Sequence, residues 1–202
     1  MESRTKVAGH PVHPMLIVFP LGLLATAVIF DIIYLVSDNS GWTVAAYYMI
    51  GAGVLGGLAA AVFGWIDWFA IPKGTRAKRV GLLHGAGNVV VVVLFALSWL
   101  LRRADPAAPP TEAVVAGLVG VVLALVTGWL GGELVDRLGV GVDDGAHLDS
   151  PSSLSELPAG AGLGVPPRAA TSAGASGWSG IERRTNPMPA YAGMERRRSH
   201  LR

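Results

Sequence analysis

Long apolar stretches alternate with short polar ones along the first two thirds of the chain. The first stretch runs from 15 to 36 and carries no charge before Asp31. A helix of that length spans about 33 Å, and the hydrocarbon core of a bilayer is roughly 30 Å thick. Three similar stretches follow, so the pattern predicts four transmembrane helices, at about 14–36, 43–71, 80–101 and 112–134.

The connections between these stretches are short, which favours consecutive helices that are antiparallel neighbours. We therefore expect an all-α integral membrane fold, with a four-helix up-down bundle over 9–142. The first connection has no basic residue, the third has Arg102 and Arg103, and the second has the most, at 73, 76, 78 and 79. Because basic loops stay on the cytoplasmic side, both termini are expected to be cytoplasmic.

The composition changes from 143 onward to Gly, Pro, Ser and Ala, with few large apolar side chains. Such a segment buries too little surface to offset its chain entropy, so we expect 143–202 to be a disordered tail. Its basic end contains ERR at 182–184 and ERRR at 195–198. Anionic headgroups are the expected partner, at about 1 kcal/mol per basic residue near the surface. No nucleic-acid partner is expected.

Overall composition limits the chemistry that the chain can perform. Hydrophobic residues make up 51% of the chain and charged residues only 15%, which is typical of a membrane protein. The absence of cysteine excludes disulfides, thiolate metal sites and cysteine nucleophiles. Phosphate loops, dinucleotide fingerprints and nucleophile-base arrangements are also missing from the sequence, so no motif indicates an enzyme.

Ionisable residues gather where the predicted helices meet one side of the membrane. They are His10 and His13 before the first helix, Asp67 late in the second, His84 early in the third and Glu133 at the end of the fourth. An up-down bundle brings these four helix ends to the same face. Ionisable groups inside a membrane are costly, so we expect this cluster to be a functional site.

Three kinds of ligand suit the cluster. A divalent metal would use His10, His13, Asp67, His84 and Glu133, a nitrogen and oxygen set that fits zinc, iron or manganese. A b-type haem would take His13 and His84 as axial ligands from two facing helices. A quinone headgroup would hydrogen-bond to His84 or Asp67, near the tryptophans at 65 and 68.

A structural role is the alternative to all three ligands. In that interpretation Asp67 pairs with His84, Glu133 pairs with Arg137, and His10 and His13 lie in the headgroup region. The chain would then be a membrane scaffold or an accessory subunit. A transporter is not expected, because the helices carry closely spaced small residues and show no broken helix with clear symmetry.

Asp31 lies apart from the cluster, on the first helix toward the opposite face. Arg102, at the end of the third helix, is its expected partner in a structural ion pair. A proton relay is not expected, because no chain of ionisable residues connects Asp31 with His13.

Four motifs occur in order along the chain: GHPVHPMLIVFPLGLL, FGWIDW, HGAGN and GWLGGELVDRLGVGV. With them the chain resembles a bacterial membrane protein family of unknown function, DUF2231, over roughly 9–142. The resemblance implies a multi-pass protein of the bacterial inner membrane. In the family the last motif often reads LVYRHGVGV, whereas Asp136 and Leu138 stand here at the tyrosine and histidine positions. Some members resemble the membrane half of proteins with a Rieske-type domain, which implies electron transfer and a membrane redox partner.

Overall fold

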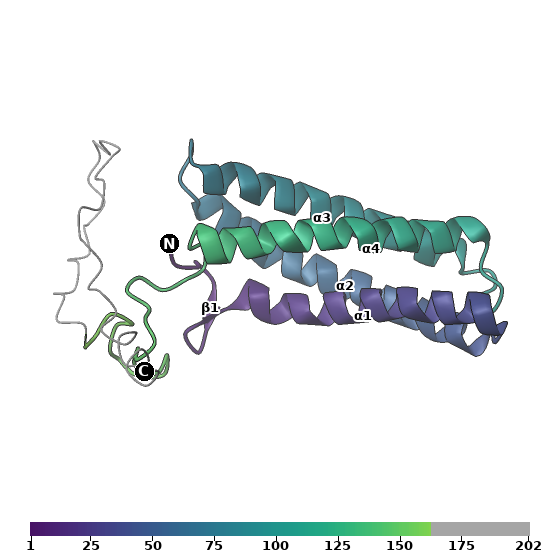
Figure 1. Cartoon of the computed structure of the whole chain (residues 1–202), viewed down its shortest axis with the longest axis horizontal. Coiled ribbons are helices and arrows are strands. Elements are labelled where there is room, and N and C mark those ends of the chain that lie inside the picture. The colour runs from purple at the N-terminus through teal and green to yellow at the C-terminus, as the bar shows by residue number, and fades with distance from the viewer. Residues whose placement is uncertain (163–202) are drawn as a thin grey trace, which may run out of the picture. The chain divides into compact units, whose positions relative to one another are not determined.

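The computed structural model describes residues 1–162 and contains four long helices (Figure 1). They are α1 (Val12–Ser37), α2 (Gly41–Ala70), α3 (Arg76–Leu101) and α4 (Thr111–Gly132), and α4 continues through the π-helical turn η1 (Glu133–Arg137). Each is long and apolar enough to cross a bilayer. The all-α fold with four membrane-spanning helices is therefore confirmed.

The start of α3 differs most from the sequence prediction. The helix begins at Arg76, one turn before the predicted start at 80, because Thr75 caps it: the Lys78 backbone N–H donates to the Thr75 hydroxyl at 3.1 Å. The basic residues of this first turn look like loop residues in sequence. They are instead the first turn of a membrane helix.

The helices pack as two hairpins. Contacts are most extensive between α1 and α2 and between α3 and α4, and those between α1 and α4 are few. Both hairpins begin at the same end of the bundle, where the strand β1 (Lys6–Val7) also lies (Figure 1). We call this end, which contains His13 and His84, the histidine end. The opposite end, which contains Asp31 and Arg102, is the ion-pair end.

The second hairpin repeats the burial pattern of the first. Four buried residues of α1 lie 71 positions before four other buried residues. Three of these lie in α3, and the fourth is Arg102, which follows it. Four buried residues of α2 likewise match four of α4 at a constant separation. The matched pairs are Pro20/Val91, Leu24/Phe95, Ala27/Ser98 and Asp31/Arg102, then Ala46/Ala113, Ile50/Gly117, Gly53/Gly120 and Ala60/Thr127.

Residues at equivalent positions of the two hairpins also meet each other. Asp31 contacts Arg102, and the His13 ring contacts the ring of His84. Contact between equivalent positions is the signature of two-fold symmetry, so the hairpins are related by a pseudo-two-fold axis along the bundle.

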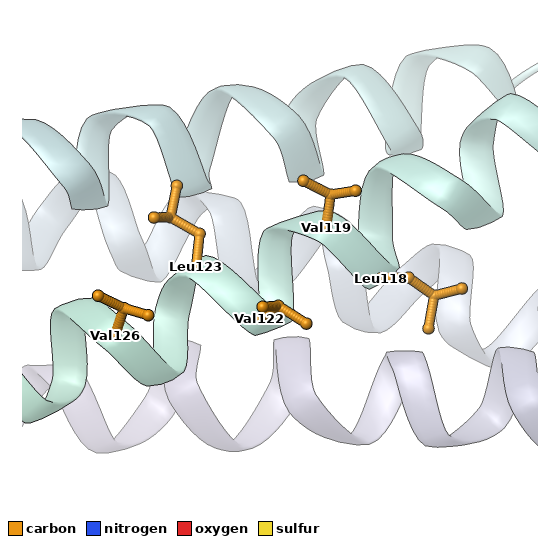
Figure 2. Close-up of a pocket in the computed structure, with 5 residues that line it drawn as sticks. All are labelled: Leu118, Val119, Val122, Leu123 and Val126. Carbon is orange, nitrogen blue, oxygen red and sulfur yellow. The ribbon is translucent and has the colours of Figure 1, made fainter.

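Most of the outer surface is apolar. Figure 2 shows a shallow groove on α4 lined by Leu118, Val119, Val122, Leu123 and Val126. Several of these side chains are half exposed, which in water would be costly. In a membrane this face meets lipid acyl chains.

The N-terminal segment folds back over the histidine end. Strands β1 and β2 (His10–Pro11) form a two-residue hairpin whose turn has positive φ at Ala8 and Gly9. A Cβ at position 9 would lie 2.7 Å from the Ser153 Cβ, so glycine is required there on two counts.

Residues 143–162 of the predicted tail lie in turns against this hairpin. The Ser153 hydroxyl donates to the Ala8 carbonyl at 3.2 Å, and Lys6 donates to the Asp143 carboxylate. This part of the tail is thus hydrogen-bonded to the N-terminal segment. Residues 163–202, with both arginine-rich motifs, lie outside the described residues.

Candidate functional site

His13 and His84 face each other at the histidine end, one from each hairpin. Their ring centroids are 6.4 Å apart and their planes are nearly perpendicular, at 88°. His13 lies in the first turn of α1, and His84 lies two turns into α3. The sequence placed these two side chains in one cluster, and the structure brings them into contact.

Each histidine is oriented by a backbone carbonyl of its own hairpin. The Nδ1 of His13 lies 2.8 Å from the Ala60 carbonyl oxygen, and the Nδ1 of His84 lies 2.8 Å from that of Thr127. A carbonyl oxygen only accepts, so Nδ1 carries the proton in both rings. In the neutral form of each ring, the Nε2 then has a lone pair.

A glycine one turn after each carbonyl makes room for the ring. A Cβ at Gly64 would lie 2.9 Å from the His13 Cε1, and a Cβ at Gly131 would lie 3.0 Å from the His84 Cε1. Gly64 and Gly131 are equivalent positions in the two hairpins. The same arrangement of histidine, carbonyl and glycine therefore occurs twice.

A cavity of about 450 Å³ separates the two hairpins at this level. All four helices line it, largely with glycine, alanine and aliphatic side chains, and with His13, His84, Asn88 and Asp67 as its polar groups. This volume lies within the usual range of small-molecule sites, roughly 300–1,000 Å³. Close approach of glycine-rich helices was expected to leave a tight bundle, but the histidine end is open inside.

The cavity has one polar wall, on the second hairpin. The Asn88 side-chain nitrogen lies 2.9 Å from the His84 carbonyl oxygen and 3.2 Å from the His84 Nε2. The Thr127 hydroxyl lies 3.0 Å from the Asn88 side-chain oxygen. At the equivalent positions of the first hairpin stand Ile17 and Ala60, which offer no polar side chain.

The other three residues of the predicted metal set lie in separate contacts. The His10 Nε2 lies 3.2 Å from the Ser153 hydroxyl, and Glu133 pairs with Arg76 at 2.6 Å. Asp67 accepts hydrogen bonds from the Ser3 hydroxyl and from a backbone N–H. Within residues 1–162, no three His, Asp or Glu side chains are placed to share a metal ion.

These contacts also replace the pairings of the structural interpretation. Asp67 bonds to Ser3 and to the Arg4 backbone N–H, at 2.7 Å in each case, and not to His84. Glu133 bonds to Arg76 and not to Arg137. Both expected pairings are wrong. The N-terminal segment supplies the partners of Asp67, and the first turn of α3 supplies the partner of Glu133.

The N-terminal segment is held in turn by an ionic cluster outside the membrane-spanning part. Lys6 lies 2.8 Å from Glu2 and also contacts Asp143. The hydrogen bond from Lys6, together with one from the Asp144 backbone N–H, lowers the pKa of Glu2. Hydrogen bonds to Asp143 and Glu2 raise the pKa of Lys6.

At the ion-pair end the facing side chains bond to each other directly. Arg102 donates to both carboxylate oxygens of Asp31, at 2.8 and 2.9 Å, and to the Ser98 hydroxyl at 3.1 Å. Asp31 is 1% exposed and Arg102 is fully buried. These are the two residues that the sequence pairs, and the bidentate geometry fits a carboxylate and a guanidinium.

Sequence reasoning placed His84 in the cluster but missed Thr127 and Ser3. Thr127 lies in an apolar helix where a lone threonine carries no signal. Ser3 lies in a polar segment that only the turn at Ala8 and Gly9 directs toward α2.

A family model described as a predicted membrane protein (DUF2231) matches residues 9–144. No curated protein and no solved structure matches the chain. The matched range spans β2, the four helices, η1 and the residues that line the cavity. The chain therefore belongs to the DUF2231 family of membrane proteins.

Proposed function

We propose that this protein binds a haem-type cofactor between its two hairpins, with His13 and His84 as the two axial ligands. The observation that carries the proposal is the pair of rings at 6.4 Å across a cavity. Two imidazoles bound to one metal ion through bonds of about 2.0–2.1 Å have ring centres roughly 6 Å apart. The rings thus have the spacing of a shared metal before any rearrangement.

The hydrogen bonds of both rings support the same proposal. Histidine ligands commonly donate their second ring N–H to a carbonyl or carboxylate, which fixes the tautomer and the ring orientation. His13 and His84 both do so, to Ala60 and Thr127. Each ring can therefore offer its Nε2 without losing the bond that positions it.

The number of available ligands favours haem over a bare metal ion. Zinc takes three or four protein ligands, whereas a haem supplies four nitrogens of its own and needs only two from the protein. Among residues 1–162 the cavity offers two imidazoles, and the nearest carboxylate, Asp67, already bonds to Ser3 and Arg4. A quinone headgroup would need only one of the two histidines. The equivalent placement of the second histidine would then be unexplained.

The chain's own residues would determine how such a cofactor behaves. Bound haem supplies one-electron chemistry, and its potential depends on axial ligands and on burial. The two imidazoles would hold the metal through their nitrogens, and the largely apolar walls would surround the rest of the group. The residues that surround the pair therefore favour electron transfer within a membrane.

We also propose the bacterial inner membrane as the location, with the histidine end toward the cytoplasm. The loop before α3 and its first turn carry Lys73, Arg76, Lys78 and Arg79 at that end. Lys78 lies 3.7 Å from the centre of the Trp68 ring and donates to the Trp68 carbonyl, which closes the end of α2. The basic residues would also face anionic headgroups.

The test is an absorption spectrum and metal analysis of the full-length protein purified in detergent, before and after titration with haem. We expect stoichiometric uptake with the spectrum of a low-spin, six-coordinate haem. His13→Gln and His84→Gln should each abolish uptake or give a five-coordinate spectrum. His10→Gln is the matched control, because His10 bonds to Ser153 outside the cavity and should leave the spectrum unchanged.

Two outcomes would contradict the proposal. A wild-type protein that takes up no haem would exclude the cofactor. If the wild type takes up no haem and the two glutamine variants lose folding or partner association, the histidines are structural. The chain would then be a scaffold or accessory subunit. A low-spin, six-coordinate spectrum that survives in both variants would exclude these two residues as ligands.

A further inference from the structure

The two hairpins meet along two seams, one between α2 and α3 and one between α1 and α4, and the first of these is filled by side chains. Three side chains of the α2–α3 seam would lie 2.9–3.5 Å from a Cβ placed on a facing glycine: Trp65 on Gly85, Trp68 on Gly81 and Val92 on Gly57. The Trp68 Nε1 also donates to the Lys78 carbonyl at 3.1 Å, which fixes its indole in the seam. The α2–α3 seam is therefore closed by contact between the helices.

The α1–α4 seam has small residues at the equivalent positions. Gly132 and Val135 lie 67 positions after Trp65 and Trp68, the separation that also relates the buried residues of α2 to those of α4. A Cβ at Gly132 would meet no atom of α1 within 4 Å, and one at Gly128 would meet no atom at all. Contacts between α1 and α4 are accordingly few, and open space remains beside these two glycines.

The cavity reaches the outer surface of the bundle at this seam. Leu21 and Val135 line the cavity and are nevertheless 55% and 44% exposed, and Pro14 and Gly128 are exposed lining residues as well. On α1 the lining runs from Pro14 to Ala25, which is about 16 Å along the helix. Half of a bilayer's hydrocarbon core is about 15 Å thick. The opening therefore lies beside lipid acyl chains.

We propose that the cavity opens into the bilayer through the α1–α4 seam, and that a hydrocarbon chain of a membrane lipid enters and occupies it there. This inference goes beyond the proposed function, because it needs only the opening and the apolar walls and no cofactor. Hydrophobic molecules dissolved in the membrane would reach the level of His13 and His84 by the same route, without passing through water.

The chemistry of the opening selects the occupant. The lining residues from Leu21 to Ala25 and from Ala124 to Gly128 offer carbon and no polar side chain other than that of the buried Thr127. A void beside such walls loses dispersion contacts, and a lipid chain that moves in restores them without giving up hydrogen bonds to water. Access from the histidine end is restricted by the N-terminal segment, whose Ser3 bonds to Asp67 at 2.7 Å.

The test uses the full-length protein in phosphatidylcholine vesicles that include a phosphatidylcholine with a photoactivatable diazirine in its acyl chain. Mass spectrometry then maps the residues that the carbene has modified. We expect adducts on Leu24 and Val91, which line the cavity and are only 7% and 4% exposed, in addition to adducts on outward residues such as Leu125. Labelling confined to outward residues of the wild type would overturn the proposal.

A tryptophan at the seam tests the route. Gly132→Trp places an indole where the α2–α3 seam has Trp65, and should remove most of the adducts on Leu24 and Val91 while those on Leu125 stay unchanged. Gly22→Trp is the matched control, because a Cβ there meets no atom within 4 Å and the residue does not line the cavity. Circular dichroism checks that both variants fold.

Inner labelling that persists in a folded Gly132→Trp variant would overturn the α1–α4 route. If that variant does not fold, the wild-type map still decides whether a lipid chain enters. All of these measurements are made without haem. A failure here would thus leave the proposed function standing, and a failure of haem uptake would leave this inference standing.

Discussion

The histidine end and the ion-pair end place equivalent residues of the two hairpins face to face, but with opposite results. At the ion-pair end Asp31 and Arg102 bond to each other, and both side chains are buried. At the histidine end His13 and His84 each bond to a carbonyl of their own hairpin, and both rings line a cavity. Facing side chains bond across the axis at one end and not at the other.

The difference shows how one symmetric arrangement serves two purposes. Opposite charges at equivalent positions satisfy each other across the axis, so they need no third group. Two like imidazoles cannot do this when both carry their proton on Nδ1, because each then has only an acceptor to offer. The cofactor that we propose would complete the arrangement by accepting both nitrogen lone pairs.

The largest expected effect comes from breaking the ion pair. Arg102→Leu leaves the Asp31 carboxylate buried and without its bidentate partner, which costs about 3–5 kcal/mol. Thermal or chemical unfolding in detergent, followed by circular dichroism, measures the loss. The double variant Asp31→Leu/Arg102→Leu removes both charges and should regain most of the stability. A single variant as stable as the wild type would show that the pair does not join the hairpins.

The glycines beside the histidines come next. Gly64→Ala and Gly131→Ala each place a methyl group about 3 Å from an imidazole carbon, and the ring cannot move without losing its carbonyl bond. Overpacking of this kind costs about 1–3 kcal/mol. Unfolding in detergent and haem titration should both register it.

Gly22→Ala provides the control for these two variants. A Cβ there meets no atom within 4 Å, and the residue does not line the cavity, so the substitution should be neutral or slightly stabilising in a helix. Equal effects at 22, 64 and 131 would mean that the glycines do not position the rings.

A smaller effect is expected from the N-terminal segment. Ser3→Ala removes a hydroxyl that donates to the Asp67 carboxylate at 2.7 Å, which weakens docking of the segment by about 1–2 kcal/mol. Hydrogen exchange of residues 1–11 should rise, while that of the helices stays unchanged. Ser37→Ala serves as the control, because its hydroxyl bonds to a backbone carbonyl at an exposed helix end. No change in exchange would show that Ser3 does not hold the segment.

The smallest effect is the pH dependence of the same segment. The Lys6 hydrogen bond lowers the pKa of Glu2 in the folded state, so docking is stabilised above the unfolded pKa and weakens as pH falls through the folded value. Lys6 has a raised pKa, so its contribution is present below its unfolded pKa and is lost as pH rises through the folded one. Hydrogen exchange of residues 1–11 against pH measures both limbs. Glu2→Gln should remove the acid limb alone, and an unchanged acid limb would contradict the assignment.

The sequence predicted the four spans and the meeting of their polar ends, because bilayer thickness constrains helix length and short loops constrain direction. It also paired Asp31 with Arg102, since both are charged residues near the same end of otherwise apolar helices. Those conclusions need no knowledge of how the helices rotate about their axes.

The rest depends on helix rotation and on chain paths that sequence patterns do not encode. The bond between Asn88 and Thr127 joins two helices whose facing sides follow from packing. The path of Ser3 to Asp67 follows from one turn at Ala8 and Gly9. The repeat was hidden because equivalent positions differ in chemistry, as Asp31 and Arg102 do, and only their burial and contacts match.

The central claim is that both histidines bind one cofactor across the pseudo-two-fold axis. Electron paramagnetic resonance of the oxidised, haem-loaded protein tests it most directly. We predict a low-spin signal typical of two imidazole ligands in the wild type, and a high-spin signal when either His13 or His84 is replaced by glutamine. A low-spin signal that survives in either variant, or a wild-type protein without bound haem, would contradict the claim.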